Sequence, residues 1–210
     1  MEIFYYKEID STQLEARRIL KSNQQATPFA VVADIQTFGI GSRSNNWDSV
    51  DGNLFMSFVL NKKNLPCDLE LVSTSIYFGY ILKLALKQLG SQAWLKWPND
   101  IYIKENKIGG IMTNIVGENI ICGIGLNLLK TEKYASLDIK IERETIVKTY
   151  FYILNEVPSW KRIFSMFRVE FDNSKDLKTH VDGQSVSLKN ALLESDGSLI
   201  IEGKRVYSLR

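Results

Sequence analysis

The sequence predicts an α+β fold, in which a mixed β-sheet packs against helices and a small all-β module follows at the C-terminal end. Three observations carry this prediction. Short apolar runs of strand length are interspersed with segments of helical periodicity. The 210 residues suffice for one good core and a small appended module. The tail changes to short alternating runs separated by Asp-Gly and Glu-Gly pairs, and Asp-Gly pairs are hairpin signals.

Composition and charge exclude several classes of protein. A content of 45% hydrophobic and 24% charged residues is ordinary for a soluble globular protein. The net charge of +2, without a basic stripe, argues against a nucleic-acid partner. No apolar run approaches the ~18 residues of a membrane span, and the N-terminus lacks the basic region and cleavage site of a secretion signal. We expect a cytoplasmic protein with no membrane partner. Its two cysteines, Cys67 and Cys122, could form one disulfide, but reduced thiols are expected.

The first half of the chain is expected to hold a strand at 3–6, a helix to about residue 22, a strand at 29–33, a long loop at 36–53 and a strand at 54–60. Asp10-Ser11-Thr12 offers capping side chains, and Glu15 follows Thr12 by three residues, as a capping box requires. The strand after the loop is almost wholly apolar and is interrupted only by Ser57. Because loops of more than about a dozen residues are usually functional or mobile, the long loop is a candidate for a functional segment.

The second half is expected to hold a helix at 69–89 that stops at Gly90, strands at 94–97, 100–103, 107–115 and 120–128, and helices at 146–157 and 160–171. From Leu177 onwards, three or four short strands would form the β module. We therefore predict a catalytic domain at 1–173 and a C-terminal module at 174–210.

One polar stretch stands out among the predicted strands. Lys96-Trp97-Pro98-Asn99-Asp100 is followed closely by Lys107-Ile108-Gly109-Gly110-Ile111. Pro-Asn-Asp is also a sound turn in purely structural terms. A lysine beside backbone amides that glycines leave accessible is nevertheless a plausible anion site, and the set suits a nucleotide phosphate better than a catalytic nucleophile.

Two glycine pairs add weaker signals. In the long loop, Gly39-x-Gly41 with Arg43 and Trp47 offers backbone amides, a cationic fork and a stacking face, although a plain flexible loop explains it equally well. Gly123-Ile124-Gly125-Leu126-Asn127 could bring backbone against a ligand, but taken alone it favours a bulge or close strand packing. His180 is the only histidine, which excludes His-rich metal sites and a Ser-His triad in the main domain.

Taken together and in order, these motifs resemble those of bacterial biotin–protein ligases. The resemblance runs from Phe4 to about Leu129 and more loosely to Arg210. It rests on five segments, which are Ile9-Asp10-Ser11-Thr12, Gln36 with Gly39-x-Gly41 and Trp47, Lys96 to Tyr102, Lys107 to Ile111, and Gly123 to Asn127. The resemblance implies the biotin/lipoate ligase fold, which is similar to that of class II synthetases, with a shortened SH3-like C-terminal module.

The resemblance also implies an activity. Biotin and Mg²⁺-ATP would give biotinyl-5′-AMP and pyrophosphate, and biotin would then pass to one lysine of the biotin carboxyl carrier protein of acetyl-CoA carboxylase or a related carboxylase. A carboxylate that attacks a phosphate needs cations to offset the repulsion between the two anions, and no protein nucleophile is required. Loop 36–53 would fold over the adenylate and keep water away from it.

By the same resemblance, each candidate residue receives a role. Lys107, Asp100 and Arg43 would be catalytic, with Lys107 where the biotin carboxylate meets the α-phosphate and Asp100 facing the acceptor lysine. Biotin would be bound by Ser11, Thr12, Gln36, Gly39, Ile40, Gly41, Lys107, Gly110, Ile111 and Gly123. The nucleotide would be bound by Ser42, Arg43, Trp47, Lys96, Asn99 and Asn127. No protein metal site is implied.

The glycine loop departs from the family pattern. Ile40 stands where an arginine is usual, and Ser42-Arg43 follows the second glycine. One positive charge is therefore missing, and we hypothesise that the adenylate is held less tightly than in an arginine-rich relative. Ile40→Arg should then slow the dissociation of the adenylate, whereas an unchanged rate would contradict the hypothesis.

Some alternatives stay open at the level of the sequence. The motif Asp10-Ser11-Thr12 begins so early that we expect no N-terminal DNA-binding domain and no repressor function. A lipoate–protein ligase shares the general fold, but the pair of lysine-containing motifs argues against it. A regulator that binds biotin or nucleotide without transfer chemistry is disfavoured because Lys107 and Asp100 are present. We expect a monomer or a weak homodimer.

Overall fold

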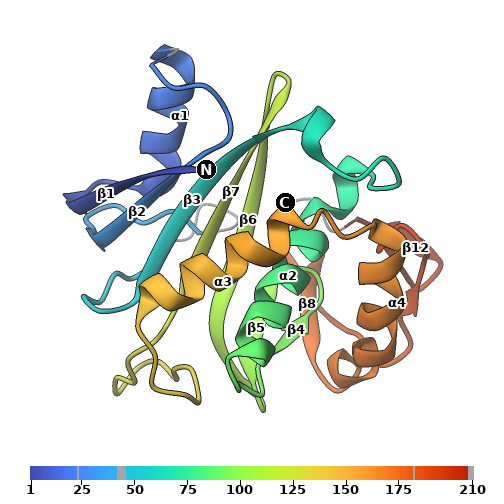
Figure 1. Ribbon diagram of the computed structural model, residues 1–210. Helices are drawn as coiled ribbons and strands as arrows, with labels where there is room; N and C mark the ends of the chain where they lie inside the picture. The colour runs from blue at the N-terminus through green and yellow to red at the C-terminus, as the bar shows by residue number, and fades with distance from the viewer. Residues whose placement is uncertain (23, 42–45, 182, 208–210) are drawn as a thin grey trace.

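A seven-stranded mixed sheet forms the centre of the structure, a computed structural model that describes residues 1–22, 24–41, 46–181 and 183–207 (Figure 1). The strand order is β1-β2-β3-β7-β6-β5-β4. Only β1 and β2 pair in parallel; every other neighbouring pair in this sheet is antiparallel. The strands are β1 (Glu2–Ile9), β2 (Phe29–Gln36), β3 (Leu54–Asn61), β4 (Trp94–Lys96), β5 (Asp100–Ile103), β6 (Asn106–Val116) and β7 (Asn119–Leu126).

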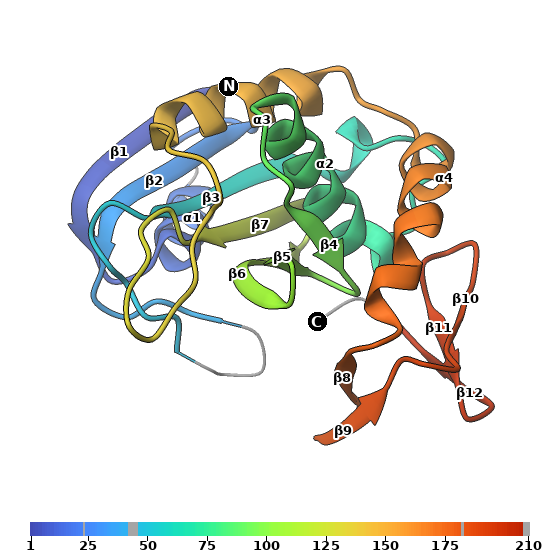
Figure 2. The ribbon, with the colours of Figure 1, turned by 90° about the horizontal axis from the view of Figure 1, so that it is seen from below.

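Helices cover both faces of this sheet (Figures 1 and 2). One face packs against α1 (Thr12–Ser22), whose buried residues Ala16 and Ile19 meet apolar side chains of β2, β3 and β7. The other face packs against α2 (Thr74–Gln88) and α3 (Arg143–Asn155), followed by α4 (Trp160–Glu170). Among the described residues, 3₁₀ turns lie at η2 (Lys62–Asn64), η3 (Leu71–Ser73) and η4 (Phe171–Ser174). None of the described helices is long and apolar enough to cross a membrane.

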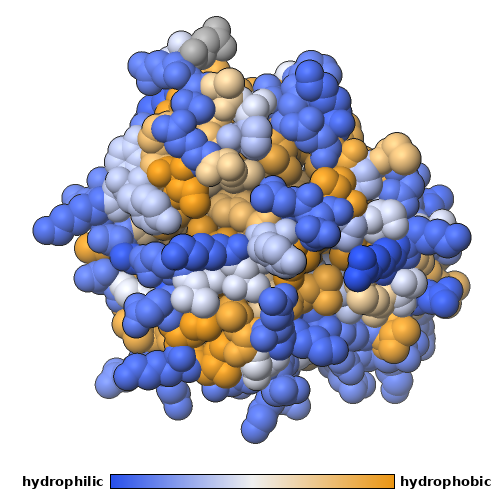
Figure 3. Space-filling model, viewed as in Figure 1, coloured by the Kyte–Doolittle hydropathy of each residue, from blue (hydrophilic) through white to orange (hydrophobic). Residues whose placement is uncertain are grey.

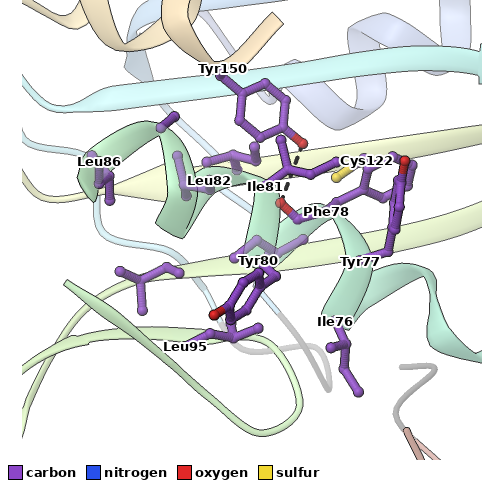
Figure 4. Close-up of a cluster of buried hydrophobic side chains, with 14 of the residues drawn as sticks. Ile76, Tyr77, Phe78, Tyr80, Ile81, Leu82, Leu86, Leu95, Cys122 and Tyr150 are labelled. Carbon is purple, nitrogen blue, oxygen red and sulfur yellow. Dashed lines mark hydrogen bonds between the residues drawn. The ribbon is translucent and has the colours of Figure 1, made fainter. Parts of the chain in front are cut away.

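The larger core surrounds α2, which is buried on nearly all sides (Figure 4). Phe58 of β3 meets Phe78 edge to face at 5.2 Å between ring centroids. The Tyr150 hydroxyl of α3 donates to the Phe78 carbonyl at 3.5 Å. Cys122 lies among these side chains as a free thiol, and burial raises its pKa. Because both faces of β3 and β7 are covered, these strands read as continuous apolar runs in the sequence.

The C-terminal strands form two small antiparallel sheets beside α4, apart from the main sheet (Figure 2). The strands are β8 (Lys178–Val181), β9 (Gln184–Ser187), β10 (Leu192–Leu193), β11 (Leu199–Ile201) and β12 (Lys204–Val206). Gly183, Gly197 and Gly203 adopt positive φ angles of 81°, 78° and 77°, as the turn signals predict. Leu199 and Ile201 belong to the same buried cluster as α2. The domain boundary at 173/174 stays a prediction.

Several expected elements differ in detail. The helix expected at 69–89 begins only at Thr74, after η3. The capping box at Thr12 is wrong. Thr12 is the first residue of α1, and its hydroxyl is bonded to Gln36 and Ser57. The Glu15 carboxylate does not reach back along the helix. It accepts hydrogen bonds from Tyr6 and Arg18.

The surface of the face in Figure 1 is mainly hydrophilic, with apolar side chains gathered in its upper half and in a second patch in its lower half (Figure 3). A separate recess of about 120 Å³ is lined by apolar residues that include Pro28, Leu60, Leu65 and Leu154. It contains no cluster of charged side chains among its lining residues. The charged and polar candidates from the sequence lie elsewhere, at the ends of the central strands.

Candidate active site

The first of two adjoining cavities lies where the N-terminus of α1 meets β6, β7 and the loop after β2. Its volume is about 50 Å³. It is lined by Ser11, Thr12, Gln13, Gln36, Ile40, Gly41, Trp47, Asn99, Asp100, Lys107, Gly110, Ile111, Met112, Gly123, Ile124 and Gly125. The sheet register explains why such distant segments meet, because β7 pairs with β3 on one side and with β6 on the other.

A short chain of hydrogen bonds forms one side of the first cavity. The backbone N–H of Thr12, at the start of α1, donates to Oε1 of Gln36 at 2.8 Å. The Thr12 hydroxyl donates to the same oxygen at 3.1 Å and lies 2.8 Å from the hydroxyl of Ser57. The Gln36 oxygen thus satisfies a free N–H at a helix N-terminus. The amide nitrogen, a donor of two hydrogen bonds, is the end of Gln36 that remains for a ligand.

A carboxylate between two lysines forms another part of the site. Asp100 Oδ1 lies 2.7 Å from the Lys107 ammonium, and Oδ2 lies 3.7 Å from that of Lys96. The β4–β5 hairpin places Lys96 opposite Asp100, and a bulge in the β5–β6 pairing places Lys107 opposite Tyr102. The side chain of Lys96 is 8% exposed and that of Lys107 is 43% exposed. Lys96 is therefore a buried partner of Asp100, whereas Lys107 is open to a ligand.

Aromatic rings lie beside both lysines of this group. The Lys96 ammonium lies 5.6 Å from the centre of the Tyr102 ring. Burial, together with the negative charge of Asp100, raises the pKa of Tyr102 to about 12. Tyr102 is therefore a neutral phenol at pH 7 and is not a candidate for a general base there.

Asn99 fixes the turn that carries Asp100. Its carbonyl accepts from the Ile111 N–H at 2.8 Å, and its side-chain nitrogen donates to the Ile111 carbonyl at 2.6 Å. These two bonds hold the turn after β4 against β6. Asn99 thus positions the carboxylate and at the same time lines the first cavity.

The second cavity has a volume of about 290 Å³ and adjoins the first. It is lined by Gly41, Asn46, Trp47, Asp48, Lys107, Gly109, Asn127 and Tyr134. Asn127 joins its walls, since its backbone N–H donates to the Ile108 carbonyl at 2.7 Å and its side-chain nitrogen donates to the Ala135 carbonyl at 3.2 Å. Its side-chain oxygen lies 3.4 Å from the amide nitrogen of Asn53.

Asp48 links two loops at the rim of the second cavity. Its Oδ2 accepts hydrogen bonds from the Lys133 ammonium at 2.5 Å and from the Tyr134 hydroxyl. Both bonds to the carboxylate, that of Lys133 above all, lower the pKa of Asp48 below its ordinary value. The loop after β2 is thereby tied to the loop after β7.

Trp47 separates the two cavities. Its ring lies over the glycines of β7, where a Cβ on Gly125 would come within 2.6 Å of the indole Cε2. The Lys107 ammonium lies 5.8 Å from the ring centre. The indole N–H is buried and has no hydrogen-bond partner. Gly41, Trp47 and Lys107 line both cavities, so Lys107 stands at their junction.

Most residues proposed from the sequence come together in this region. The first cavity collects the proposed biotin contacts except Gly39, together with Asn99 and Asp100, and Asn127 lines the second. Gly39 and Lys96 line neither cavity: Gly39 accepts from the Trp47 N–H at 2.8 Å, and Lys96 lies behind Asp100. Ser42 and Arg43 lie outside the described residues.

Other residues of the site escaped the sequence analysis, namely Gln13, Asp48, Ser57, Met112 and Tyr134. The side chain of Gln13 accounts for the glycine at position 123, because a Cβ on Gly123 would come within 2.8 Å of the Gln13 amide nitrogen. Of these residues, only Ser57 had a feature in the sequence that could have marked it, because it is a polar residue within an apolar strand. Among the described residues, no group of three or more His, Cys, Asp or Glu side chains could hold a metal ion.

Comparison with known proteins decides the family. Residues 5–127 match the model of the biotin/lipoate A/B protein ligase family. The chain belongs to this family. Among curated proteins it is 33% identical over 132 residues to the bifunctional ligase/repressor BirA of Bacillus subtilis. The matched segment covers 60% of this chain and 40% of that protein. The chain thus spans less than half the length of this relative.

Solved structures of the family confirm the predicted fold. A biotin acetyl coenzyme A carboxylase synthetase from Helicobacter pylori, solved with bound biotinylated ATP, has 38% identity and a TM-score of 0.95, with coverage of 98% of this chain and 99% of that one. The biotin protein ligase of Aquifex aeolicus, in complex with biotin and ATP, has 24% identity and a TM-score of 0.74, with coverage of 100% and 96%. The mixed sheet with helices and the small C-terminal strands are those of this ligase fold.

Proposed function

We propose that the chain is an ATP-dependent biotin–protein ligase. One observation carries the proposal, namely that two adjoining cavities meet at the exposed ammonium of Lys107. A reaction that joins a carboxylate to a nucleotide phosphate needs two neighbouring binding sites and a cation where they meet. The Helicobacter pylori relative, which was solved with biotinylated ATP, supports this assignment.

The first cavity suits the ring end of biotin. The oxygen of Gln36 is occupied by Thr12, so Gln36 offers a donor, and the ureido carbonyl of biotin is an acceptor. The dithiolane ring of lipoate has no such acceptor and would leave the buried donor unpaired, which is unfavourable. A volume of about 50 Å³ admits only a few waters. To admit biotin, the Trp47 ring would have to move away from Gly125.

The first step of the reaction takes place at the junction of the two cavities and needs no protein nucleophile. A carboxylate oxygen of biotin attacks the α-phosphorus of ATP, the bond to the β-phosphate oxygen breaks, and pyrophosphate leaves. Two anions must approach each other, and the Lys107 ammonium offsets their repulsion. Lys107 would gain a second anionic partner, while Asp100 keeps Lys96 as its other neighbour.

In the second step the amine of an acceptor lysine attacks the acyl carbon, and AMP leaves. The amine must lose a proton, and Asp100 is the carboxylate beside the junction that can orient the amine or receive that proton. The mixed anhydride reacts with water, so Trp47 and the loop after β2 would exclude solvent from it.

The second cavity would bind the nucleotide, with Asn127 and Trp47 beside the base. Mg²⁺ binds protein through one or two carboxylates together with substrate phosphates. We propose that such an ion arrives bound to the phosphates of ATP. Bound there, Mg²⁺ would add positive charge at the phosphates.

The acceptor we propose is the biotin carboxyl carrier protein of acetyl-CoA carboxylase or a related carboxylase. The name of the Helicobacter pylori relative, a biotin acetyl coenzyme A carboxylase synthetase, supports this choice. A ligase without repressor activity, acting as a monomer or a weak homodimer, stays a prediction. It also stays a prediction that the C-terminal module at 174–210 is a separate domain and that it docks the carrier.

Pyrophosphate release tests the proposal. Biotin with ATP should give rapid release, and lipoate with ATP should give little. Release with lipoate and ATP, but not with biotin and ATP, would reassign the chain to the lipoate–protein ligases. A folded chain that releases pyrophosphate with neither acid would favour a binding protein without transfer chemistry.

A further inference from the structure

Ser57 is the one polar residue in the apolar run of β3, and the roles described above do not use it. It lies in the middle of the sheet, opposite Val31 of β2 and Gly123 of β7, and its side chain is 0% exposed. A hydroxyl in such a place is unfavourable unless it is hydrogen-bonded. An alanine or valine would suit an apolar strand better, so the hydroxyl calls for an explanation.

The hydrogen bonds around Ser57 have a defined direction. The Thr12 hydroxyl carries one proton, which it donates to Oε1 of Gln36. The contact of 2.8 Å between the Ser57 and Thr12 hydroxyls is therefore donated by Ser57. A relay runs from Ser57 through Thr12 to Gln36, whose oxygen also accepts from the Thr12 N–H.

This relay sets which end of the Gln36 amide faces the first cavity. The oxygen is held by two donors of Thr12, so the nitrogen is the end left for a ligand. If Ser57 donates to Thr12, the Thr12 hydroxyl must turn its own proton towards Gln36. Without Ser57, no donor directs the Thr12 proton towards Gln36, so the hydroxyl spends part of its time in other orientations and orients Gln36 less firmly.

We propose that Ser57 is a positioning residue that, through Thr12, fixes the Gln36 amide as a hydrogen-bond donor and so selects acids whose ring carries a hydrogen-bond acceptor. Ser57 is not among the residues that line either cavity, so it would act through Thr12 and Gln36. The proposal rests on the proposed function, because the selected acid is the one that the ligase activates.

A matched set of variants isolates the hydroxyl. Ser57→Thr and Ser57→Val add the same bulk to β3, but only threonine keeps the donor. Ser57→Ala removes the donor without adding bulk. Ser75→Ala is the control, because Ser75 is also buried, lies 2.9 Å from the Thr113 hydroxyl and lines neither cavity.

The affinities for biotin and lipoate, measured by calorimetry, give the first readout. Ser57→Ala should weaken biotin binding about three- to tenfold, the effect of one lost hydrogen bond, and leave lipoate binding unchanged. Ser57→Thr should bind biotin more tightly than Ser57→Val by a similar factor. Equal loss for both acids, or equal affinities for threonine and valine, would overturn the proposal. Ser75→Ala should change stability but not the ratio of the two affinities.

A second readout needs no acid. In the parent, the side-chain amide of Gln36 should give one sharp pair of NMR signals, and in Ser57→Ala this pair should broaden or shift. Unchanged signals would overturn the proposal. A parent that binds neither acid would defeat the proposed function, while the Gln36 signals would still decide the role of Ser57.

Discussion

At the scale of single residues, the site depends on a few polar groups that their neighbours leave available. The side-chain oxygen of Gln36 accepts hydrogen bonds from Thr12 at the N-terminus of α1, and its side-chain nitrogen remains for a ligand. Lys107 shares Asp100 with Lys96 but is far more exposed than Lys96. Each group therefore has one structural partner and one face towards a cavity.

Lys107 supplies the charge at the junction, so its removal should affect chemistry more than folding. Lys107→Gln should lower the rate of adenylate formation by about 10²- to 10³-fold, the range seen when one group that stabilises developing charge is lost. Quenched-flow measurement of biotinyl-5′-AMP checks this. Lys104→Gln is the matched control, because Lys104 lies exposed in the same hairpin. A rate near that of the parent for Lys107→Gln would refute the role.

Gln36→Glu separates the two ends of the side chain. One carboxylate oxygen can still accept from the Thr12 N–H, and a negative charge at a helix N-terminus is favourable. The other oxygen replaces the donor with an acceptor. We expect about 10- to 100-fold weaker binding of biotin with no loss of thermal stability. Calorimetry and thermal melting check both parts, and unchanged affinity would contradict the donor role.

At the scale of elements, the sheet and the loops both contribute residues to the site. The ends of β5, β6 and β7 carry charged and polar residues of the site, and described residues of the loops after β2 and β7 line the second cavity. Asp48 joins these two loops through Lys133 and Tyr134. Because both ends of the ion pair are exposed, the link should be weak and sensitive to salt.

Breaking that link should speed the release of nucleotide. Asp48→Asn should raise the dissociation rate of ATP up to about fivefold at low salt, and the difference should shrink at high salt. Stopped-flow measurement with a fluorescent ATP analogue checks this. Asp172→Asn removes a similarly exposed pair with Lys175, at 2.6 Å, and should leave the rate unchanged.

The same link has a defined pH dependence. The pKa of Asp48 is lowered in the folded chain, so its contribution is present above its ordinary value of about 4 and is lost as the pH falls through the lowered value. Between pH 5 and 8 the effect of Asp48→Asn should therefore be constant. If the effect of Asp48→Asn disappeared as the pH rises towards 8, the pH dependence would be opposite to the one expected for a carboxylate with a lowered pKa.

The elements show what the sequence alone could and could not predict. Strands and helices followed from apolar periodicity, and the motifs at strand ends met because the sheet order brings those ends together. The contacts of Asp48 with Tyr134 and of Gln13 with Gly123 could not be predicted, since they depend on how separate segments pack. Thr12 shows how a local rule failed, because a tertiary partner, Gln36, took the place of the expected cap.

At the scale of the whole molecule, the C-terminal strands are joined to the motif that carries Asp100. The buried Trp97 donates from its indole to the Gly197 carbonyl at 2.8 Å, and Trp160 donates to the Ser195 carbonyl at 2.9 Å. The Ser73 hydroxyl donates to the Asp196 carbonyl at 2.5 Å. The turn at 195–197 is thus attached to three separate parts of the main fold.

Trp97→Phe should therefore destabilise the whole chain, and not just its tail. It leaves the Gly197 carbonyl without its donor, which costs about 1–3 kcal/mol for a buried group. Urea denaturation, followed by fluorescence and by circular dichroism, should show one transition at lower urea. Trp94→Phe is the control, because Trp94 donates to the Lys104 carbonyl at 2.9 Å from a half-exposed site. Equal effects of the two changes would contradict the coupling.

The central claim is that two cavities meet at Lys107 and hold the two halves of one acyl-adenylate. A crystal structure of the chain with biotinyl-5′-AMP tests it most directly. We predict the ureido carbonyl at the Gln36 amide nitrogen, the mixed anhydride beside the Lys107 ammonium, and the adenine in the cavity of Asn127 and Tyr134. A ligand bound in the reverse direction, or one that leaves Lys107 paired only with Asp100, would contradict the account.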